Sequence, residues 1–188
     1  MKLSDISEII IGSLQNREEV PESIHKYQIL NLKVWEQKTN DYQTICTKKE
    51  MTKTITKKND IIIRLTAPIK IILINNDSEN LLVTSSMCII RLTNPNINPE
   101  FLKWYLESPK FQEQIEKSLV GTSIKKISIN TLKNLTIPKI PHNIQEELAA
   151  LIKAWNQEKE ISLKIIKNKE HYYNQVMQDI IKGYDNND

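Results

Sequence analysis

Long apolar runs are missing from this sequence, and cysteine is scarce. No stretch approaches the roughly 18 consecutive apolar residues that a membrane-spanning helix needs, so we expect a protein that is not embedded in a membrane. The two cysteines, Cys46 and Cys88, lack the clustering of a disulfide framework or a zinc site, so we expect free thiols and no bound metal. The opening MKLSDISEIIIG has acidic residues and a very short apolar core, unlike a secretory signal peptide, which predicts a cytoplasmic location.

The positive charge lies in the first part of the chain. The formal net charge is +3, but the segment 144–182 holds six basic and six acidic residues and is neutral. The 20 basic and 15 acidic residues before this segment give a net charge of +5. The stretch Lys33–Lys70 alone carries nine basic and four acidic residues, with tryptophan, tyrosine and threonine between them. Such a patch suits contact with phosphates and base edges, although a solvated lysine-rich surface has the same composition.

The first 140 residues alternate between strand-like and helix-like patterns. The isoleucine-rich stretch 57–75 is interrupted by Pro68 and predicts two short strands that meet at a bend. The stretch 81–93 predicts a third strand. Apolar residues then recur at helical spacing after Pro99 and again after Pro109, which predicts a pair of helices. The pattern as a whole predicts an α+β fold with a mixed β-sheet.

The last 40 or so residues have the pattern of one continuous helix. At 1.5 Å per residue this helix would extend about 60 Å, whereas a globular domain of about 140 residues is only about 35 Å across. Its apolar residues recur every seven positions, as in a coiled coil, so we expect a partner helix from a second copy or another protein. A helix folded back on its own domain is the alternative. The residues expected to mediate dimerisation are Ile152, Trp155, Leu163, Ile166, Tyr173, Val176 and Ile180.

Two prolines separate the predicted domain from this helix. Within the IPKIP sequence, residues 137–141, each proline fixes φ and removes a backbone donor, so neither a strand nor a helix can run through. The chain there should be stiff and extended, and His142 or Asn143 should cap the helix. We therefore divide the chain into a domain, residues 1–141, and a helix with a short polar tail, residues 142–188.

The segment around these prolines resembles a known family. GTSIKKISINTLKNLTIPKIPHNIQEELAALI is similar to the end of a target-recognition domain in the DNA specificity (S) subunits of type I restriction–modification systems. The opening KLSDISEIIIGS, the NDIII strand and the helix pair INPEFLKWYLESPKFQEQI match the family in the same order, so the resemblance covers nearly the whole chain. The matching positions near the prolines are Gly121, Thr122, Lys126, Ile127, Leu132, Leu135, Ile137, Pro138, Pro141, Gln145 and Ile152.

The sequence departs from the family pattern in three respects. Family members usually carry two recognition domains and two long helices, whereas this chain has one of each, as a half-subunit would. Asn59 replaces the usual glycine before Asp60, which should alter a turn but not the strand pattern. The stretch 35–58 matches no family motif, as expected of the variable part that reads the DNA sequence.

The resemblance implies that residues 1–141 form a target-recognition domain that binds double-stranded DNA. Basic residues would contact phosphates, and Arg64 is the best candidate for bidentate contact with a guanine. The full set of candidate DNA-binding residues is Gln43, Lys48, Lys49, Thr52, Lys53, Thr54, Thr56, Lys57, Lys58, Arg64, Gly121, Thr122, Ser123, Lys125 and Lys126.

The resemblance also implies a methyltransferase (modification) subunit as a partner, with the restriction subunit as a further candidate. That partner would hold S-adenosylmethionine, so we expect no cofactor on this chain. Three glycines and the single Asn-Pro-Asn-Ile sequence do not supply a methyltransferase's glycine-rich loop and Asn/Asp-Pro-Pro-aromatic motif. Asp77 and Glu79 lie in a polar, turn-like stretch and suit a loop better than a nuclease site. We therefore expect a subunit that is not itself an enzyme.

Two copies paired antiparallel would place one domain at each end of the helices and would read an interrupted palindrome. Two alternatives remain open at this point. The chain could be a coiled-coil interaction or scaffold protein whose basic surface is incidental. It could also be the recognition subunit of a two-subunit restriction enzyme that cuts outside its site.

Overall fold

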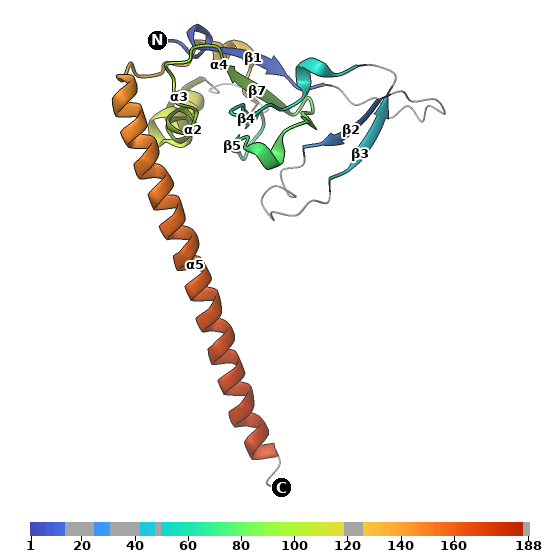
Figure 1. The fold of residues 1–188 in the computed structure, drawn as a ribbon, viewed down its shortest axis with the longest axis vertical. Coiled ribbons are helices and arrows are strands. Elements are labelled where there is room, and N and C mark those ends of the chain that lie inside the picture. The colour runs from blue at the N-terminus through green and yellow to red at the C-terminus, as the bar shows by residue number, and fades with distance from the viewer. Residues whose placement is uncertain (14–24, 31–41, 48–49, 119–125, 186–188) are drawn as a thin grey trace. The chain divides into compact units, whose positions relative to one another are not determined.

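The structure is a computed structural model that describes residues 1–13, 25–30, 42–47, 50–118 and 126–185. The chain divides into two compact units, Met1–Glu146 and Glu147–Asp188 (Figure 1). The first unit contains two sheets and three α-helices among the described residues, and the second is part of one long helix. The predicted α+β class is therefore confirmed.

A four-stranded antiparallel sheet lies at the centre of the first unit. Its strands have the order β1 (Ser7–Ile11), β7 (Met87–Leu92), β4 (Ile61–Arg64) and β5 (Ile71–Leu73). The three isoleucines that begin β4 are fully buried, as the uninterrupted apolar run predicts. Strands β4 and β5 pair as a hairpin, which confirms the two strands predicted on either side of Pro68.

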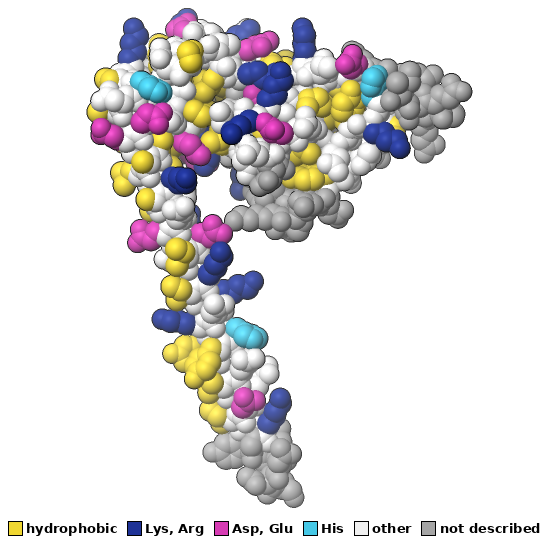
Figure 2. All heavy atoms as spheres, in the orientation of Figure 1, with side chains coloured by type: hydrophobic (Ala, Val, Ile, Leu, Met, Phe, Trp, Pro, Cys, Tyr) yellow, Lys and Arg dark blue, Asp and Glu magenta, His cyan; other side chains and the backbone are white. Residues whose placement is uncertain are grey.

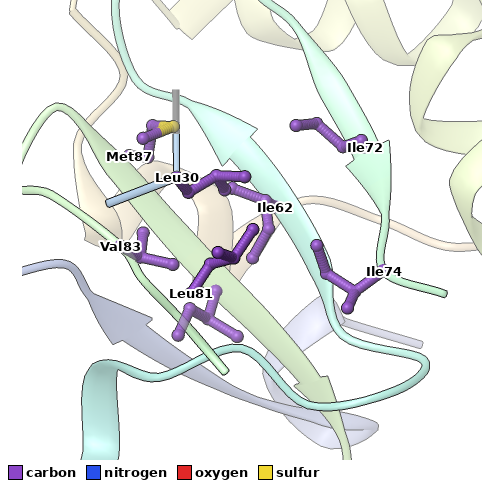
Figure 3. Close-up of a cluster of buried hydrophobic side chains, with 8 residues drawn as sticks. Leu30, Ile62, Ile72, Ile74, Leu81, Val83 and Met87 are labelled. Atoms are coloured by element: carbon purple, nitrogen blue, oxygen red, sulfur yellow. The ribbon is translucent and has the colours of Figure 1, made fainter. Parts of the chain in front are cut away.

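The predicted third strand is divided in two. Residues Leu81–Leu82 form β6 and Met87–Leu92 form β7, and they belong to different sheets. The second sheet has the order β3 (Thr44–Thr47), β2 (His25–Ile29), β6, with β2 antiparallel to β3 and parallel to β6. A cluster of buried side chains from both sheets and their flanking segments forms the core shown in Figure 3: Leu30, Ile62, Ile72, Ile74, Leu81, Val83, Met87 and Ile89.

The helix pair is confirmed, as α2 (Pro99–Glu107) and α3 (Pro109–Ser118). Asn98 caps α2 by accepting a hydrogen bond from the Phe101 backbone N–H, and a proline occupies the first turn, where its missing donor has no cost. Short 3₁₀ turns occur at Leu3–Asp5 (η1), Thr52–Thr54 (η2) and Asn76–Ser78 (η3). A further helix, α4 (Ile129–Asn134), was not predicted.

The chain's first residues pair with the segment that follows α4. The Leu3 N–H donates to the Leu135 carbonyl (2.9 Å) and the Ile137 N–H donates to the Met1 carbonyl (2.8 Å). Between them, both backbone groups of Thr136 are bound by the helix pair: its N–H donates to Gln114 Oε1 (3.0 Å), and its carbonyl accepts from the Tyr105 hydroxyl (3.1 Å). These hydrogen bonds therefore join the first residues of the chain to the segment just before the prolines.

The long helix α5 runs from His142 to Asp185, which is 44 residues and about 66 Å. His142 already lies inside the helix, so the predicted capping by His142 or Asn143 is wrong, and Pro141 is the last residue before it. In the first turn, Gln145 is 1% exposed. Its Oε1 accepts from the Asn98 N–H (2.9 Å), and its Nε2 donates to the carbonyls of Ile140 (2.8 Å) and Asn96 (3.2 Å).

Among the described residues, no helix is long and apolar enough to cross a membrane. Cys46 is exposed, Cys88 is buried, and both are free thiols. Burial raises the pKa of Cys88 to about 12, so this thiol stays protonated at neutral pH.

Replacing Gln145 with alanine should destabilise the first unit. The change leaves the Asn98 N–H and the Ile140 carbonyl without their partner, and buried groups that lose a hydrogen bond cost about 1–3 kcal/mol. We expect a decrease of that size in the free energy of unfolding, measured by urea denaturation. Gln157→Ala, at an exposed position of the same helix, is the control and should change stability by less than about 0.5 kcal/mol. Equal losses for the two variants would contradict this role.

Candidate nucleic-acid interface

The end of β4 brings together two predicted DNA-binding residues that are far apart in sequence. Arg64 is the last residue of β4, and its Nε donates to the Thr66 hydroxyl (3.3 Å). Thr66 forms an antiparallel bridge with Lys126, and the neighbouring Ile127 N–H donates to the Leu65 carbonyl (2.8 Å). We call Arg64, Thr66 and Lys126 the β4-end cluster.

The bridge places Lys126 opposite Thr66, whose hydroxyl is bound by Arg64. Directly opposed residues of an antiparallel pair point to the same face, and so do residues two positions apart on one strand. Arg64 binds the Thr66 hydroxyl, Thr66 is bridged to Lys126, and Lys126 is exposed. Two positive charges and a hydroxyl side by side suit a phosphate or the edge of a guanine.

The second set of candidates precedes β4. Thr52 and Lys53 are exposed in η2, and Lys57 and Lys58 are exposed in the turn that leads into the strand. Thr54 is half-buried, and its hydroxyl donates to the Met51 carbonyl (3.3 Å). We call residues 51–58 the η2 segment. Because the four residues of β4 rise about 13 Å, this segment and the β4-end cluster are separate surfaces rather than one continuous patch.

Thr56 is not available for reading bases, contrary to the sequence-based prediction. It is 1% exposed, and its hydroxyl donates to the Ser78 carbonyl (2.8 Å) while it accepts from the Leu81 N–H (2.9 Å). Its backbone also pairs with Leu81 and Asn80. Thr56 therefore fastens the η2 segment to the core beside β6.

An ion pair between the buried Asp60 and the partly buried Arg91 holds the same segment. Arg91 in β7 donates from Nε to Asp60 Oδ1 (2.9 Å) and from Nη2 to Asp60 Oδ2 (2.6 Å), and Asp60 is 2% exposed. Arg91 Nη2 also donates to the Ile55 carbonyl (2.9 Å), and Asp60 Oδ2 also accepts from the Lys57 N–H (2.8 Å). The hydrogen bond to Asp60 is the main reason that the pKa of Arg91 is raised. Sequence reasoning missed Arg91, although a lone arginine in an apolar strand was a usable signal.

Asn59 adopts a left-handed backbone conformation, with φ of 67°. Its N–H donates to the Ile74 carbonyl (3.0 Å), and β4 begins two residues later. Asparagine tolerates this conformation better than most residues, so it can take the place of the family's glycine. The strand pattern is preserved, as predicted.

An open hollow of about 650 Å³ lies beside the η2 segment. It is lined by residues of β5 and η3, by Lys58 and Asn59, and by Glu100 and Lys103 of α2. Its charges are of both signs, and Lys103 forms an ion pair with Glu107 (2.7 Å). Among the residues that the structure describes, no group of three or more histidine, cysteine, aspartate or glutamate side chains could hold a metal ion.

The remaining candidates divide into two groups. Gln43 is exposed immediately before β3, and its carbonyl accepts from the Ile29 N–H (2.8 Å). Six candidates lie outside the described residues: Lys48, Lys49, Gly121, Thr122, Ser123 and Lys125.

In α5, apolar side chains recur along the helix with charged side chains between them (Figure 2). Ile152 is only 7% exposed, so it is not part of the exposed apolar stripe, contrary to the prediction. The other six predicted dimerisation residues are all exposed: Trp155, Leu163, Ile166, Tyr173, Val176 and Ile180. Further exposed apolar residues of α5 are not among the seven predicted for dimerisation: Leu151, Ile161, Ile165, Tyr172, Met177 and Ile181.

Three solved structures have a similar fold. The S subunit of a type I restriction-modification system from M. genitalium is 23% identical, with a TM-score of 0.56 over 85% of this chain and 39% of that chain. The HsdS subunit from Thermoanaerobacter tengcongensis is 15% identical, with a TM-score of 0.61 over 84% and 37%. A structure described as the basis of complex assembly and conformational transition of the type I R-M system is 18% identical, with a TM-score of 0.66 over 90% and 46%.

This chain therefore spans less than half the length of the proteins it resembles in fold. No curated protein matches it in sequence. The sequence profile described as "Type I restriction modification DNA specificity domain" matches residues 1–170. Because this match covers most of the 188 residues, the chain belongs to the family of type I restriction-modification DNA specificity domains.

Proposed function

We propose that this chain is the sequence-specific DNA recognition subunit of a type I-like restriction–modification methyltransferase complex. The observation that carries the proposal is the family match over residues 1–170, which includes the first unit and most of α5. In this proposal residues 1–141 are the target-recognition domain, and residues 142–188 are the dimerisation helix with its tail.

The β4-end cluster and the η2 segment are the proposed DNA contacts. Lys126, Lys53, Lys57 and Lys58 are exposed and suit phosphate contact, whereas Arg64 has the planar donor set for a guanine. The chemistry of methyl transfer and its cofactor belong to a cytoplasmic methyltransferase partner, so this chain supplies recognition and no catalysis. The two-subunit restriction enzyme would use the same DNA-binding surface and differ only in its partner. The alternative that the chain is a coiled-coil scaffold protein is weaker, because it does not explain why the first unit matches the family.

A second copy of the chain is the proposed partner of the exposed stripe on α5. In one antiparallel register, Leu163 lies opposite Ile166 of the second copy, and the two-fold axis repeats the contact. The same register places Lys159 opposite Glu170 and Glu160 opposite Lys169, so opposite charges meet where charged residues interrupt the apolar stripe. Parallel pairing would instead bring both recognition domains to the same end of the helices. Charge matching and space therefore both favour the antiparallel dimer.

Replacing Lys125 and Lys126 together with alanine should weaken DNA binding in a salt-dependent manner. Each lost phosphate contact reduces the slope of log affinity against log salt by about 0.9, so we expect a reduction of about 1.8. Fluorescence anisotropy with a labelled duplex over a salt series measures both quantities. The control is the double alanine variant at Lys133 and Lys139, which are exposed but outside both contact surfaces. Unchanged binding of the Lys125 and Lys126 variant at every salt concentration would remove these two lysines from the interface.

Reversing one charge in the proposed dimer should dissociate it. Lys159→Glu places like charges opposite each other at two symmetric positions, and adding Glu170→Lys restores the match. We expect multi-angle light scattering to show a dimer for the native chain and the double variant, and a larger monomer fraction for the single variant. The measurement is repeated with the methyltransferase subunit bound, in case dimerisation depends on it. A double variant that behaves like the single variant would refute this register.

The DNA target should share the two-fold symmetry of the dimer. Because α5 is about 66 Å long, the centres of the two inverted half-sites should lie within about 19 base pairs of each other at a rise of 3.4 Å. Methylome sequencing of cells that express this chain with its methyltransferase should therefore reveal an interrupted palindrome. An asymmetric or uninterrupted methylated motif would rule out recognition by a homodimer.

A further inference from the structure

The ion pair of Asp60 and Arg91 has contacts beyond itself that converge on one short stretch of backbone. Arg91 Nη2 binds the Ile55 carbonyl, and Asp60 Oδ2 binds the Lys57 N–H. These two residues flank Thr56, whose hydroxyl bridges the Ser78 carbonyl and the Leu81 N–H on the opposite side. Residues 55–57 are therefore fixed from β7 on one side and from the residues around β6 on the other.

The fixed stretch presents the exposed candidates of the η2 segment. Lys53 lies two residues before it, Lys57 is its last residue, and Lys58 follows it. The Val83 N–H also donates to the Thr54 carbonyl (2.9 Å), so the turn that carries Lys53 is attached to the core as well. Asp60 is buried, and the Nε and Nη2 donors of Arg91 are already used within the fold, so this pair would act on DNA only through the segment it holds.

Stability alone does not account for this ion pair, in which the Asp60 side chain is 2% exposed and the Arg91 side chain 20%. Removing two charges from water has a large desolvation cost, and exchanging a buried ion pair for packed apolar residues is often neutral for stability. Apolar residues cannot reproduce the hydrogen bonds that this pair makes with the Ile55 carbonyl and the Lys57 N–H. A recognition surface needs such a hold, because contacts to base edges require geometry within about 0.5 Å, whereas phosphate contacts tolerate movement.

We propose that Asp60 and Arg91 are positioning residues that set how well this chain discriminates between DNA sequences. The inference rests on the proposed function, in which the η2 segment faces DNA. A loosened segment keeps its lysines and its attraction for the backbone, but it no longer holds its side chains in register with one set of bases. The pair should therefore affect specificity much more than general affinity for DNA.

The test uses the full native chain and a preferred duplex obtained by selection from a random-sequence library. Binding of that duplex and of a scrambled duplex is then measured for the native chain and for three variants: Arg91→Lys, Asp60→Glu, and Asp60→Leu with Arg91→Met. We expect the ratio of the two affinities to fall about 10-fold in each variant, the size of one lost base contact, while the scrambled duplex binds within about twofold of native and with an unchanged salt slope.

Thermal unfolding identifies variants that are folded, and the two single variants keep both charges if the apolar double variant does not fold. Lys117→Met removes the exposed ion pair with Glu113 (2.6 Å) on α3 and is the matched control, with discrimination expected to stay native. Folded Arg91→Lys and Asp60→Glu variants that discriminate as well as the native chain would overturn the inference and leave the proposed function intact. A native chain that selects no preferred duplex, alone or with its methyltransferase subunit, would overturn both.

Discussion

The pairing of the chain's first residues with Leu135–Ile137 is the constraint on which the first unit depends. It joins the N-terminal residues to the last segment before the prolines. Thr136, at the centre of this segment, is bound by Tyr105 of α2 and Gln114 of α3. Because η1 leads directly into β1, these hydrogen bonds connect the helix pair to the strand that begins the sheet. The first unit is therefore closed by backbone pairing between its first residues and residues near its end.

Two glutamine side chains, Gln114 and Gln145, bind backbone N–H and carbonyl groups in this part of the first unit. Gln114 receives the Thr136 N–H and donates to the Thr136 carbonyl, while Gln145 receives the Asn98 N–H and donates to two carbonyls. A carboxamide has a donor and an acceptor on one rigid group, so it can satisfy peptide groups where no neighbouring strand is available. A glutamate at either position would lose the donor, and an apolar residue would leave peptide groups unpaired.

The sequence predicted the elements whose patterns are local, and it missed what depends on contacts between distant segments. The isoleucine runs, Pro68, Pro99 and Pro109 were sufficient for the β4–β5 hairpin and the α2–α3 pair. The division of residues 81–93 between two sheets could not be foreseen, since pairing partners decide it rather than alternation.

The same distinction applies to the candidate site. Exposed lysines were recognisable by composition, and the resemblance of the Gly121–Lys126 stretch to the family pointed to Lys126. The proximity of Lys126 to Arg64 depends on the bridge at Thr66, and the burial of Thr56 depends on Ser78 and Leu81. The sequence alone does not show whether a threonine hydroxyl faces solvent or binds a backbone group. Only the structure shows that Thr56 is buried and Thr54 is half-buried.

The residues that support the η2 segment and the exposed side chains that the segment carries differ in how freely they can be substituted. Asp60 and the apolar residues of β4 are buried and Arg91 is partly buried, so substitutions there carry the costs of cavities and unpaired charges. The side chains of Thr52, Lys53 and Lys57 are exposed, and substitutions at such positions usually alter stability by less than about 0.5 kcal/mol. The residues proposed to contact DNA can therefore vary while the residues that support the η2 segment stay the same. Under the proposed function, recognition of a new sequence then needs new side chains on the η2 segment and no new fold.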